Sequence, residues 1–323
     1  PSAVMGRNAD LVEKAKKRAL EHGVPADFLG HLGGYTGAMA VLNTGRPGPV
    51  TGIPVDIDCL PIEESNDPAH EANAGNYRSV YPGFSHACGH DGHTAVGLAA
   101  ARWLSENREK LCGTVKILFQ PAEEGVRGAA AMAAKGIVDD VNWFAGAHIG
   151  CSARLGQVGV SHFGYLATTK FDLRYHGLAA AAGSPEKGRS ALMCGAATCM
   201  SLGSLPGHSQ GITRVQIGRF ESGTGRNIIA ENAFMQLEVR GESTEINDYM
   251  AANVEMTVKG LAVAYGVDYE LTRMGEAVTY RGDEEAVSIV KEVAAQVPGV
   301  DSVVDMNAKI GSEDCTMLIR RVQ

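Results

Sequence analysis

The residues best suited to chemistry lie in one short stretch, His86-Ala87-Cys88-Gly89-His90-Asp91-Gly92-His93. Three histidines, a cysteine and an aspartate fall within eight residues, and thiolate and imidazole are ligands for metals of the zinc class. Glycines at 89 and 92 let the backbone bend tightly between the ligands. A polar turn around a buried cysteine is the alternative interpretation. We favour a metal site, because building a core does not require so many ligand atoms.

Two further segments with ligand side chains come after predicted buried strands. The apolar run 115–119 leads into Gln120-Pro121-Ala122-Glu123-Glu124-Gly125, and the run 143–148 ends on His148. Adjacent carboxylates at a strand end point in different directions, so one can bind a metal while the other faces a substrate. An inert surface Glu pair and a satisfied core histidine are the alternatives. A site that shares two divalent ions would need the sulfur, nitrogen and oxygen atoms of Cys88, His90, Glu124 and His148.

Strands and helices alternate through the first half of the chain. We expect strands at 38–42, 50–57, 115–119 and 143–148, with helices at 10–22, 94–109 and 129–135. This alternation predicts an α/β fold with a mixed, mainly parallel sheet flanked by helices and with sites at the strand ends. A further helix of the same kind is expected at 284–296.

The order of elements changes between residues 168 and 272. There the patterns predict strands at 168–176, 212–220, 233–240 and 267–271, and helices at 189–202 and 246–265. The β-α-β-β-α-β order is that of a ferredoxin-like domain. We therefore expect a first domain in two parts, 1–166 and 279–323, interrupted by an inserted domain at 167–278.

Length and composition exclude several classes of protein. A chain of 323 residues fits two domains, and a net charge of −8 with a pI near 5.7 argues against binding to nucleic acid or to a membrane surface. Seven scattered cysteines, an odd number, argue against a disulfide framework and favour the cytoplasm. Because the chain starts at Pro1 and stops within a predicted helix, we expect the natural protein to extend beyond both ends.

Four motifs, in this order along the chain, resemble the amidohydrolase branch of the aminoacylase/carboxypeptidase metallopeptidase family. They are His86–His93, Gln120–Gly125, Ala147-His148 and Gly311-Ser312-Glu313-Asp314. The resemblance covers nearly the whole chain and implies a di-metal peptidase-like domain with an inserted lid and dimerisation domain. Within the branch, four shorter runs resemble the first of the two homologous subunits of p-aminobenzoyl-glutamate hydrolases: Thr44–Val50, Gly136–Val141, Ala167–Asp172 and Gly225–Asn227.

The resemblance implies a role for each candidate residue of the site. Cys88 would bridge two divalent ions, manganese or zinc, with His90, Glu124 and His148 as further ligands. Glu123 would be the general base that takes a proton from water and passes it to the leaving amine. The strand-end pair Asp56 and Asp58 would orient ligands rather than coordinate. A strand that simply ends on two acidic residues is the alternative for this pair, and His93 is expected to give structural support.

In the inserted domain, the resemblance implies two substrate-binding residues. Arg240 would grip the α-carboxylate of the substrate bidentately, although an exposed ion pair is the alternative. Asn227 matches an asparagine that contacts substrate from a partner subunit. The family also holds a lid histidine that polarises the scissile carbonyl, and its position falls on Ala181; His176 is out of register. A last family ligand, also a histidine, is expected beyond Gln323.

The expected function is metal-dependent hydrolysis of an N-acyl or N-aroyl amino acid, in particular of p-aminobenzoyl-glutamate to p-aminobenzoate and glutamate. A homologous second subunit, or a homodimer through the lid, is the expected partner. Related enzymes acting on indoleacetyl-aspartate, hippurate-like or acetylated substrates are the nearest alternative. Because of Ala181, a non-catalytic metal-binding subunit is also an open alternative.

Overall fold

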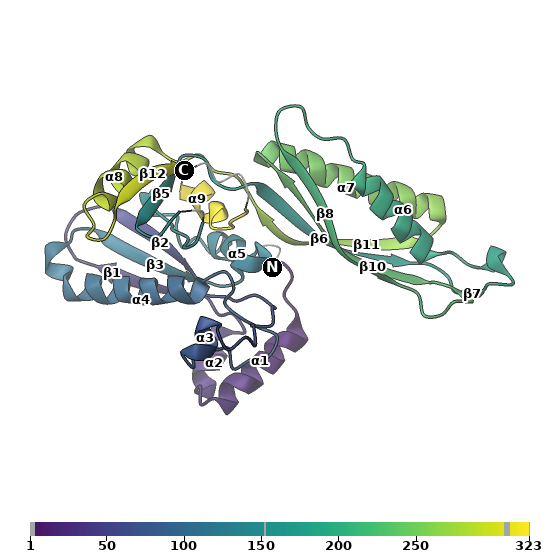
Figure 1. The fold of residues 1–323 in the computed structure, drawn as a ribbon, viewed down its shortest axis with the longest axis horizontal. Coiled ribbons are helices and arrows are strands. Elements are labelled where there is room, and N and C mark those ends of the chain that lie inside the picture. The colour runs from purple at the N-terminus through teal and green to yellow at the C-terminus, as the bar shows by residue number, and fades with distance from the viewer. Residues whose placement is uncertain (1–3, 152, 307–310, 323) are drawn as a thin grey trace. The chain divides into compact units, whose positions relative to one another are not determined.

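The computed structural model describes residues 4–151, 153–306 and 311–322. The chain divides into two compact units, which are described separately (Figure 1). The first unit contains residues 1–162, 282–306 and 314–323, and the second contains residues 163–281 and 307–313. The predicted insertion, 167–278, falls inside the second unit. No helix in the described part of the chain is long and apolar enough to cross a membrane.

A four-stranded sheet in the order β1-β3-β2-β4 forms the centre of the first unit. Its strands are β1 (Ala38–Asn43), β2 (Val50–Asp56), β3 (Thr114–Gln120) and β4 (Trp143–Phe144). β2 runs parallel to β3 and to β4, whereas β1 pairs with β3 antiparallel. The sheet is therefore mixed and mainly parallel, as predicted. Leu118 of β3 is fully buried and belongs to an apolar core that includes Ala129, Val138 and Leu318.

Helices and one further strand pair complete the first unit. Its helices are α1 (Ala9–Glu21), α2 (Ala26–Leu32), α3 (Glu71–Ala74), α4 (His90–Glu106), α5 (Gly128–Ala134), α8 (Glu284–Ala294) and α9 (Thr316–Val322), with 3₁₀ turns η1 (Arg108–Lys110) and η2 (Glu123–Gly125). Strand β5 (Gln157–Ser161) pairs in parallel with β12 (Ser302–Met306). Asn8 and Asp283 cap α1 and α8 by accepting backbone N–H groups.

The structure corrects two predicted boundaries close to the candidate site. Helix α4 begins at His90, not at Thr94, because Gly89 takes a left-handed conformation (φ 83°) and ends the preceding turn. The strand predicted through His148 stops at Phe144. Ala145 still donates its N–H to the backbone oxygen of Gly52 at 3.1 Å, but the next bond of the ladder would need the N–H of residue 54 in β2, and Pro54 has none. His148 therefore lies on an irregular segment.

The second unit has an antiparallel sheet with strand order β11-β6-β10-β8. Along the chain its main elements alternate as β6 (Ala167–His176), α6 (Ala191–Gly203), β8 (Thr213–Ser222), β10 (Asn232–Gly241), α7 (Thr244–Tyr265) and β11 (Asp268–Ala277). A short ribbon of β7 (Ala180–Ala181) and β9 (Ile228–Ile229) adds to it, with the 3₁₀ turn η3 (Pro185–Lys187) between β7 and α6. The inner face of the sheet and the two helices form one buried core that includes Phe171, Leu173, Met235 and Val254.

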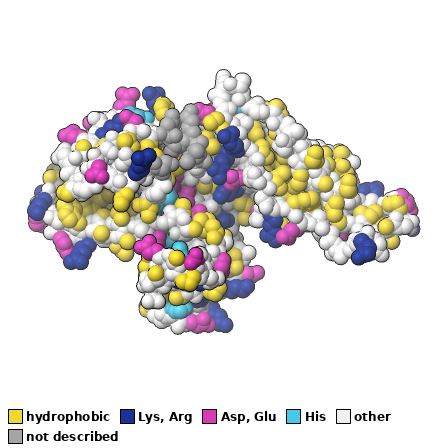
Figure 2. Space-filling view, in the orientation of Figure 1, with side chains coloured by type: hydrophobic (Ala, Val, Ile, Leu, Met, Phe, Trp, Pro, Cys, Tyr) yellow, Lys and Arg dark blue, Asp and Glu magenta, His cyan; other side chains and the backbone are white. Residues whose placement is uncertain are grey.

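The helices of the second unit also present apolar side chains to solvent. Hydrophobic side chains gather over this unit in the space-filling view (Figure 2). The large exposed apolar residues of the two helices are Leu192, Met193 and Met200 on α6 and Met256 and Val263 on α7.

Candidate metal centre

The predicted ligands meet at one edge of the sheet in the first unit. β2, β3 and β4 are parallel, so their carboxyl ends lie at the same edge, where Asp56 pairs with Gln120. Asp58 follows β2, the Glu123–Glu124 turn follows β3, and the segment with His148 follows β4. The first turn of α4 adds His90 and His93. Residues up to 92 positions apart in sequence are therefore brought together by the parallel strand order.

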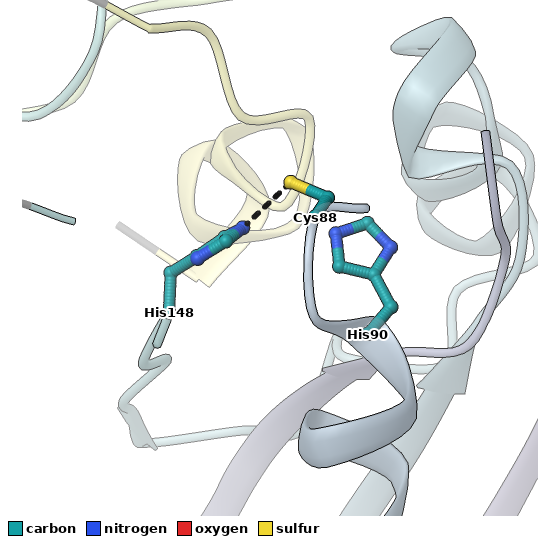
Figure 3. Close-up of side chains that lie close together, drawn as sticks. All are labelled: Cys88, His90 and His148. Carbon is teal, nitrogen blue, oxygen red and sulfur yellow. Dashed lines mark hydrogen bonds between the residues drawn. The ribbon is translucent and has the colours of Figure 1, made fainter. Parts of the chain in front are cut away.

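Cys88, His90 and His148 form a group whose ligand atoms all lie within 4.8 Å of one another (Figure 3). Cys88 Sγ lies 3.4 Å from His148 Nε2. A metal–sulfur bond of about 2.3 Å and a metal–nitrogen bond of about 2.0 Å would fit one ion to both atoms at this separation. The donor set and its spacing therefore fit a divalent ion of the zinc class.

His90 links this group to the carboxylates. Its Nδ1 donates to the backbone oxygen of Asp58 at 3.1 Å, which leaves Nε2 as the nitrogen that could coordinate a metal. Nε2 is buried and has no hydrogen-bond partner among the described residues, and it lies 3.8 Å from Glu123 Oε2. His90, Glu123 and Glu124 form a second group with the geometry of a metal site. A cation bound here would give this buried nitrogen the partner that it lacks among the described residues, and the carboxylates would balance the cation's charge.

The carboxylate of Asp58 holds the Glu123–Glu124 turn. Its two oxygens accept the backbone N–H groups of Glu123 and Glu124, each at 3.1 Å. The turn lies between two non-glycine residues in the left-handed region, Ala122 (φ 60°) and Val126 (φ 48°). Such conformations cost free energy and persist where the surroundings fix them, typically at functional sites. Asp58 supplies part of that fixation.

The electrostatics of the site favour protons on two of the predicted ligands when no metal is bound. Burial and the charges of Glu124 and Glu123 raise the pKa of Cys88 to about 12. Burial lowers the pKa of His90, but the hydrogen bond to Asp58 and the charges of Asp56, Asp58 and Glu123 outweigh it and raise that pKa to about 9. A cation that binds here must therefore displace protons from both groups.

Comparison with known proteins identifies the family. The sequence profile of Peptidase family M20/M25/M40 matches residues 52–323. The chain belongs to this family. It is 42% identical over 324 residues to a homologue, in Haemophilus influenzae, of one of the subunits of p-aminobenzoyl-glutamate hydrolase, covering 100% of this chain and 77% of that protein. It is 43% identical to the indole-3-acetyl-aspartic acid hydrolase of Enterobacter agglomerans, covering 96% of this chain and 72% of that protein.

Solved structures agree with this assignment. A crystal structure of an aminobenzoyl-glutamate utilization protein from Klebsiella pneumoniae has a TM-score of 0.85 and 39% identity, covering 100% of this chain and 76% of that one. A dinuclear metal-binding peptidase of the M20 family from Bacillus subtilis has a TM-score of 0.63 and 26% identity, covering 99% of this chain and 82% of that one. The M20 family therefore includes dinuclear metal enzymes with this fold.

Both ring nitrogens of His93 are engaged in hydrogen bonds in this M20 chain. Its Nε2 accepts the backbone N–H of Ile149 at 3.0 Å, so Nδ1 carries the proton and donates to Asp56 Oδ2 at 3.1 Å. Burial and the nearby His148 lower the pKa of His93, which keeps this tautomer neutral. One oxygen of Asp56 is thus engaged with His93, and Asp56 Oδ1 is buried without a hydrogen-bond partner among the described residues.

Two residues of the quoted motifs acquire a structural role that the sequence did not reveal. Asp314 is fully buried and accepts from Gln120 Nε2 at 2.5 Å and from the backbone N–H of Ala129 at 2.9 Å. It therefore ties the start of α9 to the end of β3 and to the start of α5. Both residues lie in motifs shared with the family, but 194 positions separate them in the chain, and no local pattern pairs them.

The three candidate residues of the inserted domain lie in the second unit. Arg240 lies next to the last residue of β10 and is half-buried, and its Nε donates to Glu238 Oε1 at 2.7 Å. Ala181 of β7 is exposed and pairs with Ile228 of β9. The backbone oxygen of Asn227 accepts the N–H of Ala182 at 2.9 Å, so Asn227 and Ala181 lie on the same ribbon. His176, which is exposed at the end of β6, lies 3.6 Å from Glu270.

Proposed function

We propose that this M20 chain is a metal-dependent amidohydrolase that cleaves N-acyl or N-aroyl amino acids. The observation that carries the proposal is that His90 belongs to two groups of potential metal ligands, one with Cys88 and His148 and the other with Glu123 and Glu124, and that its buried Nε2 has no hydrogen-bond partner among the described residues. We propose two divalent ions, held by these four residues, with Cys88 between them. The mixture of thiolate, imidazole and carboxylate is compatible with zinc or manganese.

The proposed reaction adds water across the amide bond and releases a carboxylic acid and an amine. When bound, the ions would polarise the scissile carbonyl and lower the pKa of water. Glu123 would take the proton from water as the new C–O bond forms, and would return it to the amine nitrogen as the C–N bond breaks. Its backbone is fixed by Asp58, which holds the carboxylate 3.8 Å from His90 Nε2. Asp56 and Asp58 are proposed to orient ligands only.

For the substrate we propose p-aminobenzoyl-glutamate, cleaved to p-aminobenzoate and glutamate. The proposal is supported by the names and the 39–42% identities of a curated relative and of a solved structure. Indoleacetyl-aspartate is the second candidate, because a hydrolase of that conjugate is 43% identical. Both substrates offer an amino-acid α-carboxylate, which we propose that Arg240 and Asn227 bind. The Arg240–Glu238 contact would then have to rearrange.

We further propose that the second unit is a ferredoxin-like lid and dimerisation domain. Its β-α-β-β-α-β order and the exposed apolar residues on α6 and α7 support this. The partner would be a homologous second subunit, since the Haemophilus influenzae relative is named after one component of a hydrolase with several, or a second copy of this chain. The odd number of scattered cysteines supports a cytoplasmic location.

A direct assay tests the proposed function. The purified protein, loaded with manganese or zinc and supplied with or without the second subunit of a relative, is offered p-aminobenzoyl-glutamate, and the release of glutamate is measured. We expect turnover that is lost in Glu123→Gln while the bound metal is retained. Indoleacetyl-aspartate in a parallel reaction decides between the two substrates. Metal uptake without release of an amino acid from either substrate would overturn the proposal and favour a non-catalytic subunit.

A further inference from the structure

His93 contacts two of the proposed metal ligands without being one. Its ring is stacked on that of His90, with centroids 5.2 Å apart and planes at 24°, and meets the ring of His148 edge to face, with centroids 4.4 Å apart. Both of its nitrogens are already used, one by Asp56 and the other by Ile149. The side chain is buried and sits on the first turn of α4. Its role must therefore be exerted through its neighbours.

Ile149 is the residue through which His93 reaches His148. The N–H of Ile149 donates to His93 Nε2 at 3.0 Å, and its backbone oxygen accepts from His148 Nδ1 at 2.6 Å. Because a carbonyl can only accept, the proton of His148 is on Nδ1. The other nitrogen, Nε2, is then the one that lies 3.4 Å from Cys88 Sγ. Both the ring orientation and the tautomer of His148 thus depend on where Ile149 is held.

The side chain of Ile149, which is 47% exposed, packs on its inner side against the two glycines of the motif. A Cβ atom at either Gly89 or Gly92 would lie 2.8 Å from Ile149 Cδ1. The glycines of the motif therefore leave space for Ile149 beside the start of α4, in addition to allowing the turn. This matters because residues 146–149 lie beyond the end of β4, in a segment without regular secondary structure. Among the described residues, the His93 bond is the hydrogen bond that ties the Ile149 N–H to the rest of the site.

We propose that His93 is a positioning residue that ties the Asp56 carboxylate to the Ile149 backbone and thereby presents His148 Nε2 to the ion shared with Cys88. This inference rests on the proposed metal site and gives a role to a residue that is not one of the proposed ligands. Residues that orient metal ligands typically contribute 10–100-fold to metal affinity. His93→Phe keeps a ring of similar size but removes both hydrogen bonds.

The test measures zinc affinity and stoichiometry by competition with a chromophoric chelator, in the wild type and in a His148→Ala background. We expect His93→Phe to weaken the binding of one zinc ion by ~10–100-fold when His148 is present. In the His148→Ala background, we expect it to have no further effect on zinc affinity. Thermal unfolding of the metal-free variants checks that they fold. An equal loss of zinc affinity in both backgrounds, or no loss of zinc affinity when His148 is present, would overturn the inference.

Two conservative variants separate the two ends of the His93 ring. Glutamine places an amide near the position of Nε2, where it can accept from Ile149, whereas asparagine reaches only the position of Nδ1 and can donate to Asp56. We expect His93→Gln to restore most of the zinc affinity and His93→Asn to behave like His93→Phe; the reverse order would contradict the role. If the wild type itself binds no zinc, the proposed function fails, which is distinct from failure at His93.

Discussion

Cys88 and His90 determine how the site takes up an ion, because both hold protons that the ion must replace. Burial, followed by the charges of the nearby carboxylates, raises the pKa of the Cys88 thiol, whereas for His90 the carboxylates raise the pKa against the effect of burial. The same carboxylates would stabilise a bound cation. When a divalent cation binds, it would replace the protons of these two groups, so the net charge of the site would change little.

This exchange predicts a strong pH dependence of metal binding. Cys88 has a pKa of about 12 and His90 of about 9, so at pH 7 the metal-free site carries both protons. Binding should release up to two protons below pH 9 and one above it. The apparent zinc affinity should then rise by up to ~100-fold per pH unit below pH 9. Titration calorimetry in buffers of different ionisation enthalpy measures the protons released, and a value of zero at pH 7 would contradict these pKa shifts.

At the level of residues, the sequence predicted which side chains gather but not how His93 is used. The ligand types in the sequence grouped Cys88, His90, Glu124 and His148 as candidate ligands, and the family resemblance added Glu123 as the candidate base. The role of His93 depends on a hydrogen bond to Ile149, 56 positions away, and on the tautomer that this bond imposes. Neither is encoded in a local pattern.

Among the secondary-structure elements of the first unit, Asp58 connects three. It follows β2, accepts from the turn after β3 and, through its backbone oxygen, from His90 at the start of α4. An asparagine there has only one side-chain oxygen to accept a hydrogen bond. One N–H of the Glu123–Glu124 turn would lose its charged acceptor.

We therefore predict that Asp58→Asn lowers the free energy of unfolding by about 1–3 kcal/mol and weakens zinc binding by ~10–100-fold. Urea unfolding and the chelator competition measure the two effects. Asp248→Asn, at an exposed position of α7 in the second unit, is the matched control and should change neither. Unchanged zinc affinity in Asp58→Asn would show that the turn does not depend on this carboxylate.

Asp314 has the corresponding role for the packing of α5 and α9. Removing it in Asp314→Ala leaves the amide of Gln120 and the N–H of Ala129 buried without their acceptor. The expected loss is about 2–5 kcal/mol of unfolding free energy. Denaturant midpoints of Asp314→Ala and Asp314→Asn check this, and the asparagine variant should lose less because it retains one acceptor oxygen. Wild-type stability in both variants would refute the role.

The elements themselves were predicted in type more reliably than in extent. Periodicity identified the buried strand β3 and the helices α4 and α7, because their apolar patterns are long. It placed the start of α4 four residues too late and ran β4 to His148. Those limits depend on the left-handed Gly89 and on Pro54 in the neighbouring strand, which act only in the folded sheet.

Ala181 stands where the family resemblance implies a lid histidine, and this difference bears on the activity of the whole molecule. Ala181 is exposed on a short ribbon, so a larger side chain should not disturb the fold. If the family histidine polarises the carbonyl, Ala181→His should raise the turnover of p-aminobenzoyl-glutamate by up to ~10²–10³-fold. The assay is the release of glutamate. His176→Ala, at an exposed position nearby in sequence, should have no effect; loss of turnover in that variant would mean that His176 has replaced the missing histidine.

The change in element order near residue 168 is the sequence signal from which we predict an inserted domain. The substrate was not predictable, because two relatives of nearly equal identity act, by their names, on different conjugates. Their common feature is an amide to an acidic amino acid. The shape of the pocket that distinguishes the acyl groups is set by loops whose conformation no sequence pattern fixes.

The proposed activity depends on divalent metal held by Cys88, His90, Glu124 and His148. Anomalous diffraction from zinc-soaked crystals of the protein tests it most directly, because it locates the ions themselves. We expect anomalous peaks within coordination distance, about 2.0–2.3 Å, of Cys88 Sγ and of the Nε2 atoms of His90 and His148. Peaks elsewhere in the chain, or none at this edge of the sheet, would contradict it.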